Sequence, residues 1–210
     1  NAEICRTLTE NAKMNGADMI VFPELSLTGF SFSAPEEKGR GDFSTVDFFS
    51  EIARSFGMAC VFGYARKCDG KVYNTLVAVD SSGRPIAGYD KMHLFSIGGE
   101  SDVCTSGTEI CVFKCGGFSF GLTICYDLRF PELYSKLAED CDCIIISANW
   151  GAARTEHWDT LLRSRSIETQ CYVAGCNCLC TEGMKCGGNS AIYAPDGTRI
   201  AFAGESEKLI

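Results

Sequence analysis

The stretch GLTICYDLRFPEL, residues 121–133, joins two kinds of backbone. Its apolar first half extends a run that begins at Phe118 and predicts a buried strand over residues 118–124. Pro131 suits the first turn of a helix, because its fixed φ is already helical. Cys125 therefore falls in a sharp turn between a strand and a helix, where backbone N–H groups can bind an anion. This position predicts a nucleophilic thiol, provided that the chain also supplies a base and an oxyanion donor.

Two other polar side chains close apolar strands in the same way. Glu24 follows the run DMIVF at residues 18–22, and Lys91 follows a strand predicted over residues 86–89. Ligands and chemistry in α/β folds gather at the carboxyl ends of strands. A carboxylate can act there as a general base, and an ammonium group beside it favours a thiolate. The residues therefore predict a catalytic set of Glu24, Lys91 and Cys125.

A histidine base is the more common partner of a cysteine nucleophile, and the chain has two histidines. If the segment after Lys91 is extended, His93 points to the face opposite Lys91. His157 is expected to open a helix, where a structural role is more common. A papain-like Cys–His pair stays open as the second choice.

The pattern of apolar residues predicts a mixed α/β fold in one domain covering residues 1–210. Residues 91–108 are expected to form an irregular loop, and Leu161, Leu162, Ser164 and Ile167 to face inward from the last helix. Helices are predicted over residues 2–14, 45–56, 132–139 and 157–170, and strands over residues 18–22, 58–65, 72–80, 86–89, 118–124, 143–147, 171–177, 190–194 and 199–202.

Composition limits the classes of function. The 210 residues are 46% hydrophobic and 22% charged, as in an ordinary globular domain, and the formal net charge is -8. This acidity and the absence of a Lys/Arg cluster argue against nucleic acid as a partner. No stretch of the sequence is apolar for long enough to span a bilayer, so we expect no membrane partner.

The chain has 14 cysteines, many of them inside apolar runs, where cysteine behaves as a small hydrophobe. A disulfide framework belongs to short, loop-rich secreted chains, so we expect a reducing cytoplasm instead. Cys176, Cys178, Cys180 and Cys186 lack the paired C-x2-C spacing of zinc sites. We therefore expect no metal site.

Three motifs, in order along the chain, resemble those of the nitrilase superfamily, the carbon–nitrogen hydrolases. They are FPEL at residues 22–25, YDKMHLF at residues 89–95 and CYDLRFPE at residues 125–132. The similarity extends to residues 149–150, 157–162, 165–168, 188–190 and 195–197. The short loop after Lys91, together with Asn149-Trp150 and Ala153-Arg154, looks most like the omega-amidase branch and its YafV-like bacterial members.

The resemblance implies a four-layer α-β-β-α sandwich, dimerised through the helical layer that carries Cys125. It also implies a first strand before Ala2 and a strand and tail after Ile210. The superfamily carries a second catalytic glutamate, which maps to Glu100. It needs no metal or organic cofactor.

The implied activity is hydrolysis of a small amide through a thioester on Cys125. Lys91 and the backbone N–H of Tyr126 would bind the oxyanion. An omega-amidase substrate such as 2-oxoglutaramate or succinamate carries a carboxylate, for which Arg154 is the candidate partner because its planar fork suits bidentate recognition. Arg154 could equally be a surface residue before a helix, and Trp150 could line the substrate pocket or belong to the core.

Two other readings stay open. One is a different activity of the same superfamily, such as that of a nitrilase or of an amidohydrolase acting on N-carbamoyl amino acids or carbamoylputrescine. The other is a non-catalytic scaffold on the same fold.

Overall fold

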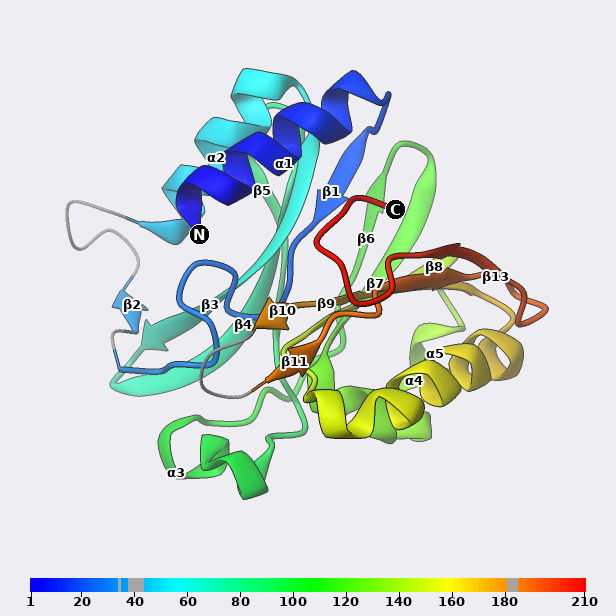
Figure 1. Cartoon of the computed structure of the whole chain (residues 1–210). Helices are drawn as coiled ribbons and strands as arrows, with labels where there is room; N and C mark the ends of the chain where they lie inside the picture. The colour runs from blue at the N-terminus through cyan, green and yellow to red at the C-terminus, as the bar shows by residue number, and fades with distance from the viewer. Residues whose placement is uncertain (34, 38–43, 181–184) are drawn as a thin grey trace. The chain divides into compact units, whose positions relative to one another are not determined.

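The computed structural model describes residues 1–33, 35–37, 44–180 and 185–210. The chain divides into two compact units, Asn1–Glu109 and Ile110–Ile210. Each unit is built from a β-sheet with helices packed on it (Figure 1). The predicted mixed α/β class is therefore confirmed.

The first unit contains a five-stranded sheet in the order β1-β3-β4-β5, with β2 paired to β3. Strand β1 runs parallel to β3, whereas β4 is antiparallel to both β3 and β5. Strands β1, β3 and β5 thus point the same way, and their carboxyl ends share one edge of the sheet. The elements are α1 (Ala2–Met14), β1 (Met19–Val21), β2 (Glu36–Glu37), α2 (Thr45–Phe56), β3 (Ala59–Cys68), β4 (Lys71–Val79), β5 (Pro85–Asp90), the 3-10 helix η1 (Ser96–Gly98) and α3 (Glu100–Val103).

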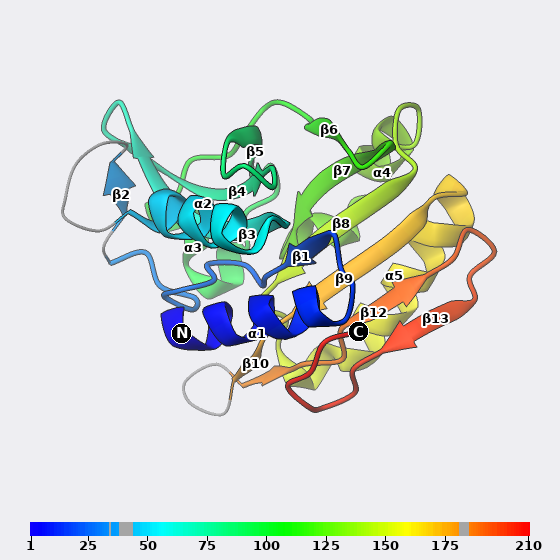
Figure 2. The same ribbon diagram turned by 90° about the horizontal axis from the view of Figure 1, so that it is seen from above.

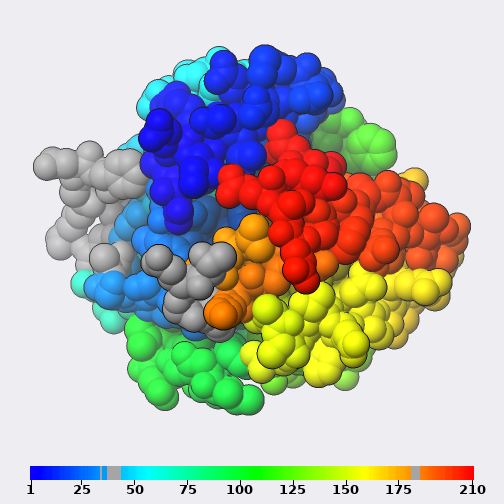
Figure 3. All heavy atoms as spheres, in the orientation of Figure 1, coloured from blue at the N-terminus to red at the C-terminus, as the bar shows by residue number. Residues whose placement is uncertain are grey.

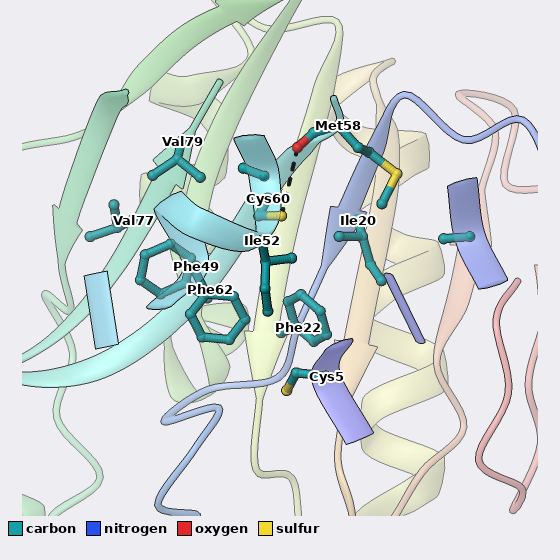
Figure 4. Packing of buried hydrophobic residues seen from close by; sticks show 12 residues of the cluster. Cys5, Ile20, Phe22, Phe49, Ile52, Met58, Cys60, Phe62, Val77 and Val79 are labelled. Carbon is teal, nitrogen blue, oxygen red and sulfur yellow. Dashed lines mark hydrogen bonds between the residues drawn. The ribbon is translucent and has the colours of Figure 1, made fainter. Parts of the chain in front are cut away.

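An apolar core joins α1 and α2 to this sheet (Figure 4). Phe49 on α2 stacks on Phe62 of β3 with ring centroids 4.2 Å apart. Helix α2 begins after Ser44, whose hydroxyl accepts from the Asp47 N–H, and it ends at Gly57, which takes a left-handed φ of 59°. These caps place the apolar side of α2 on the sheet. Helices α1 and α2 lie side by side (Figure 2). Helix α1 forms part of the surface of the first unit (Figure 3), and its Glu3, Glu10 and Lys13 are exposed.

The second unit contains a six-stranded sheet in the order β13-β12-β9-β8-β7-β6. A separate two-stranded sheet, β10-β11, lies between β9 and β12 in the sequence. Strands β7, β8 and β9 are parallel and central, and the flanking strands are antiparallel. The elements are β6 (Val112–Cys115), β7 (Phe118–Ile124), the 3-10 helix η2 (Cys125–Arg129), α4 (Pro131–Leu137), β8 (Cys143–Ala148), the 3-10 helix η3 (Ala152–Arg154), α5 (Thr155–Thr169), β9 (Tyr172–Asn177), β10 (Leu179–Cys180), β11 (Cys186–Gly187), β12 (Ala191–Tyr193) and β13 (Arg199–Phe202).

Helix α5 packs on β9 and β12 through a face that includes the predicted Leu162 but not the predicted Ile167. Trp158, Leu162 and Ser166 are buried, but Ile167 is 45% exposed, so the prediction that Ile167 faces inward was wrong. The large ring of Trp158 sets the rotation of the helix, and it reaches Gly175 of β9, where a Cβ atom would lie 2.8 Å from it. Residues spaced by four from Trp158 then meet the sheet.

The segment over residues 91–108, predicted to be irregular, contains the short helices η1 and α3. Within the described ranges, no helix is both long and apolar enough to cross a membrane.

Candidate active site

In the first unit, polar residues gather where the parallel-running strands end. Glu24 follows β1, and Lys91 follows β5, at the edge that these strands share. The backbone N–H of Lys91 donates to the carbonyl of Asn74 on β4, so the chain stays paired with the sheet as far as Lys91. Helix α3 begins at Glu100 and brings a second carboxylate to the same place.

The side chains of Glu24, Lys91 and Glu100 form one buried cluster. The Lys91 ammonium nitrogen lies 2.9 Å from Glu24 Oε1 and 2.9 Å from Glu100 Oε2. None of the three residues is more than 1% exposed. Buried charges require partners, and here one ammonium serves two carboxylates.

Asn74 completes this cluster, and the sequence analysis did not identify it. Its Nδ2 donates to Glu24 Oε1 and to Glu100 Oε1, both at 2.7 Å. Glu100 is held further by the backbone N–H of Phe95, which donates to Oε2 at 2.7 Å. An asparagine inside a predicted strand was the available signal, because asparagine is depleted in strands.

The Cys104 thiol of the first unit lies near these charges and is not activated by them. The pKa of Cys104 is raised to about 12, mainly by burial and in smaller part by the negative charges of Glu100 and Glu24, whereas the positive charge of Lys91 opposes the shift. The Cys104 side chain is therefore protonated at neutral pH and is a poor nucleophile.

The turn that carries Glu24 fits closely against β3. Gly63 donates its N–H to the Ser26 hydroxyl at 3.0 Å and accepts from the Ser26 N–H at 2.9 Å. A Cβ atom on Gly63 would lie 2.7 Å from the Leu25 nitrogen and 3.2 Å from Glu24 Cα. Leu25 itself has a φ of +50°, a left-handed conformation that is unfavourable for leucine. Gly63 thus permits the close approach that fixes the backbone of Glu24.

In the second unit, Cys125 occupies the predicted turn between strand and helix. It follows β7 directly, begins η2, and is 8% exposed. Its φ is +48°, which is rare for a residue with a side chain and is typical of strained positions at functional sites. The Asp127 carboxylate accepts from the Ile124 N–H at 3.0 Å and so ties the turn together.

Two buried side chains, Arg165 and Tyr134, contact the residues on either side of this turn. The Arg165 guanidinium of α5 donates through Nε and Nη2 to the Leu128 carbonyl, at 3.2 and 3.0 Å. The Tyr134 hydroxyl lies 3.0 Å from the Thr123 hydroxyl, and complete burial raises the pKa of Tyr134. The conformation of Cys125 is thus held by neighbours on both sides in the sequence.

Trp150 and Arg154 lie beyond the carboxyl end of β8, the strand next to β7. Trp150 is 5% exposed, and its indole N–H donates to the Arg154 carbonyl at 2.7 Å. Arg154 is half-buried. The guanidinium of Arg129 lies 4.8 Å from the centre of the Trp150 ring and also faces the ring of Tyr126 at 5.8 Å. Trp150 therefore orders the loop that carries Arg154.

The structure brings Glu24, Lys91 and Glu100 together in the first unit. It places Cys125, Tyr126, Trp150 and Arg154 beyond adjacent parallel strands of the second unit. The Nδ1 atom of His157 lies 3.1 Å from Arg129 Nη2, which donates to it, and gives no support to a papain-like pair. Among the described residues, no group of three or more His, Cys, Asp or Glu side chains is arranged to hold a metal ion.

This chain is similar to several known amidases. The chain is 35% identical over 198 residues to a 2-oxoglutaramate amidase of Bacillus subtilis, a match covering 92% of this chain and 76% of that protein. It is 33% identical to the omega-amidase YafV of Escherichia coli, over 90% of this chain and 74% of that protein. Its fold matches the crystal structure of XC1258 from Xanthomonas campestris, a CN-hydrolase superfamily protein with an arsenic adduct in its active site. That match has a TM-score of 0.88 at 29% identity and covers 99% of this chain and 83% of the other.

The family model for carbon–nitrogen hydrolases matches residues 1–210. This confirms the family and the α/β fold that the three sequence motifs implied. The chain belongs to the carbon–nitrogen hydrolase family.

Proposed function

We propose that this protein is an omega-amidase, which hydrolyses the terminal amide of a small molecule carrying a carboxylate at its other end and releases ammonia. Compounds of this class include 2-oxoglutaramate and succinamate. The observation that carries the proposal is the buried Lys91 ammonium, 2.9 Å from the carboxylates of both Glu24 and Glu100. Such a cluster is expensive to bury and is typical of sites that transfer protons. The names of the relatives support the substrate class.

In the proposed first step, Glu24 takes the thiol proton of Cys125 and the thiolate attacks the amide carbonyl carbon. The carbonyl oxygen becomes an oxyanion, which the Lys91 ammonium and the backbone N–H of Tyr126 stabilise. Such preorganised charge stabilisation is usually the largest single contribution to catalysis. The left-handed backbone of Cys125 supports this role, because it turns the thiol out of the line of β7.

In the second step, the C–N bond breaks and Glu24 gives its proton to the departing ammonia. The acyl group remains on Cys125 as a thioester. Glu24 then takes a proton from water, the hydroxide attacks the thioester, and the carboxylic acid leaves as the proton returns to the sulfur. Glu100 orients Glu24 and Lys91. Amide and water give carboxylic acid and ammonia, and no cofactor takes part in the proposed cycle.

We assign recognition of the distant substrate carboxylate to Arg154. Its guanidinium suits bidentate binding of a carboxylate. Trp150 supports this assignment indirectly, because its indole N–H holds the Arg154 carbonyl at 2.7 Å. The substrate-facing role of Trp150 is then that of an apolar wall beside Arg154.

The proposal extends to assembly and location. We propose a homodimer formed through the helical layer that carries Cys125, and a cytoplasmic protein. Many of the 14 cysteines lie inside apolar runs, where cysteine behaves as a small hydrophobe, which supports a reducing compartment. Light scattering of the purified protein tests the dimer.

The decisive experiment measures ammonia release from 2-oxoglutaramate and succinamate, with a simple nitrile and an N-carbamoyl amino acid assayed in parallel. Cys125→Ala removes the proposed nucleophile. Cys68→Ala is the matched control, because Cys68 is an exposed thiol at the end of β3. We expect turnover of the omega-amides that is lost in Cys125→Ala and kept in Cys68→Ala.

Turnover of the nitrile or the carbamoyl compound alone would support Cys125 as the nucleophile but would contradict the proposed substrate class. Full activity of Cys125→Ala would refute the mechanism. A non-catalytic scaffold predicts no turnover of any of these compounds and equal alkylation of Cys125 and its buried neighbours.

A further inference from the structure

The amide of Asn74 links the two carboxylates of the buried cluster. Asn74 lies inside β4 and is 1% exposed. Its Nδ2 is 2.7 Å from Glu24 Oε1 and 2.7 Å from Glu100 Oε1. An amide NH2 has two hydrogens, so each carboxylate receives one of them.

The orientation of this amide follows from its neighbours. If the amide were rotated by half a turn, Oδ1 would face two carboxylate oxygens and repel both. With Nδ2 toward the carboxylates, Asn74 Oδ1 is the one buried side-chain oxygen or nitrogen in the described residues without a hydrogen-bond partner. A buried acceptor left in this state is destabilising, and native structures contain few of them. The two N–H donors, and not a gain in stability, therefore explain why asparagine occupies this position.

We propose that Asn74 is a positioning residue for the reaction, an inference that rests on the proposed function. It fixes Oε1 of Glu24 as the anchored oxygen and so assigns proton transfer to Oε2. Glu100 provides the fixed point, because its two oxygens accept from Asn74, Lys91 and the Phe95 N–H. Because its Nδ2 donates to both carboxylates, Asn74 holds Glu24 at a fixed distance from Glu100.

Lys91 alone does not provide this restraint. Its ammonium is a compact charge on a flexible stem, and it is shared between Glu24 Oε1 and both oxygens of Glu100. A carboxylate held by one such charge can turn about its own C–C bond. A second donor on the same oxygen, from a rigid amide on a central strand, removes that rotation.

The test uses Asn74→Leu, which has a similar volume and no donor, and Asn74→Ser, which fits the same space if the leucine variant does not fold. Thr9→Val is the matched control, because Thr9 is also fully buried in the first unit and its hydroxyl donates to the Cys5 carbonyl on α1. We expect both Asn74 variants to lower kcat at least tenfold with KM changed less than twofold. We expect their unfolding midpoints to lie close to that of Thr9→Val, which keeps wild-type kcat.

A double-mutant cycle with Glu100→Gln separates positioning from general destabilisation. If Asn74 acts by linking the carboxylates, its loss matters less once Glu100 has lost its charge. The fold loss of kcat in the double variant should then be smaller than the product of the fold losses in the two single variants. Wild-type kcat in Asn74→Leu would overturn the inference. A double variant whose fold loss of kcat equals the product of the two single losses would also overturn it. Inactive Cys125→Ala and Glu24→Gln beside an active Asn74→Leu would reject the role of Asn74 and leave the proposed function intact.

Discussion

Replacing Gly63 by alanine tests whether the position of Glu24 controls activity. The new Cβ would lie 2.7 Å from the Leu25 nitrogen, whereas ordinary contact begins at 3.4 Å, so the two must separate by about 0.7 Å. The strand and the turn cannot slide apart freely, because Gly63 and Ser26 exchange two hydrogen bonds of 2.9 and 3.0 Å. The displacement therefore passes to Glu24, whose Cα lies 3.2 Å from the added atom.

A shift of this size should cost activity more than stability. Misplacing a reacting group by about 1 Å can lower a rate on the order of a hundredfold. We expect Gly63→Ala to lower kcat about ten- to a hundredfold. Overpacking typically costs about 1–3 kcal/mol of unfolding free energy. For a chain of this length, each kcal/mol corresponds to roughly 2–4 °C in Tm.

The matched control is Gly88→Ala on β5 of the same sheet, where an added Cβ would meet nothing within 4 Å. The assay compares kcat for 2-oxoglutaramate and Tm for the wild type and both variants. Gly88→Ala should keep both values. An unchanged kcat in Gly63→Ala, or an equal loss in Gly88→Ala, would refute the link between this glycine and Glu24.

Three further predictions concern the second unit. Gly175→Ala would place a Cβ 2.6 Å from Leu162, so we expect unfolding in urea to become easier by about 1–3 kcal/mol. Arg165→Met removes both donors to the Leu128 carbonyl, and circular dichroism during urea unfolding should report a loss of about 1–3 kcal/mol. Burial raises the pKa of Cys143 from 9.0 to about 12, so the unfolded chain loses this proton first and stability should fall as pH rises from 9 towards 12. At pH 8 the folded protein keeps the Cys143 thiol protonated, so iodoacetamide should label Cys143 only after unfolding, as peptide mass spectrometry can establish.

The sequence predicted the positions of residues that end apolar strands. Glu24, Lys91 and Cys125 each follow a run whose pattern indicates a strand. In the structure, Lys91 and Cys125 lie directly after β5 and β7, and Glu24 lies in the turn that follows β1. Such residues are predictable because the direction of the chain alone determines which edge of the sheet they reach. Glu100 was different, since it lies in a segment without a clear pattern and only the family resemblance indicated it.

Asn74 and the packing of α5 could not be predicted in this way. The contacts of Asn74 join β4 to the ends of β1 and β5 and to α3, and no local pattern records such long-range bonds. The rotation of α5 depends on how Trp158 fits over Gly175, which decides between two faces of similar composition. Both features depend on side-chain shape between elements that are distant in the sequence.

The unfavourable features of the structure argue against a non-catalytic scaffold. Among the described residues, five that are not glycine have positive φ. Asp69 and Gln170 lie in a hairpin turn and at a helix end, where this conformation is ordinary, and Asn189 is of a residue type that adopts it readily. Leu25 and Cys125 have no such reason, yet they lie at Glu24 and at the predicted nucleophile. The unsatisfied Oδ1 of Asn74 adjoins the same cluster. Selection for stability alone would remove each of these costs, so their concentration at the predicted catalytic residues indicates selection for chemistry.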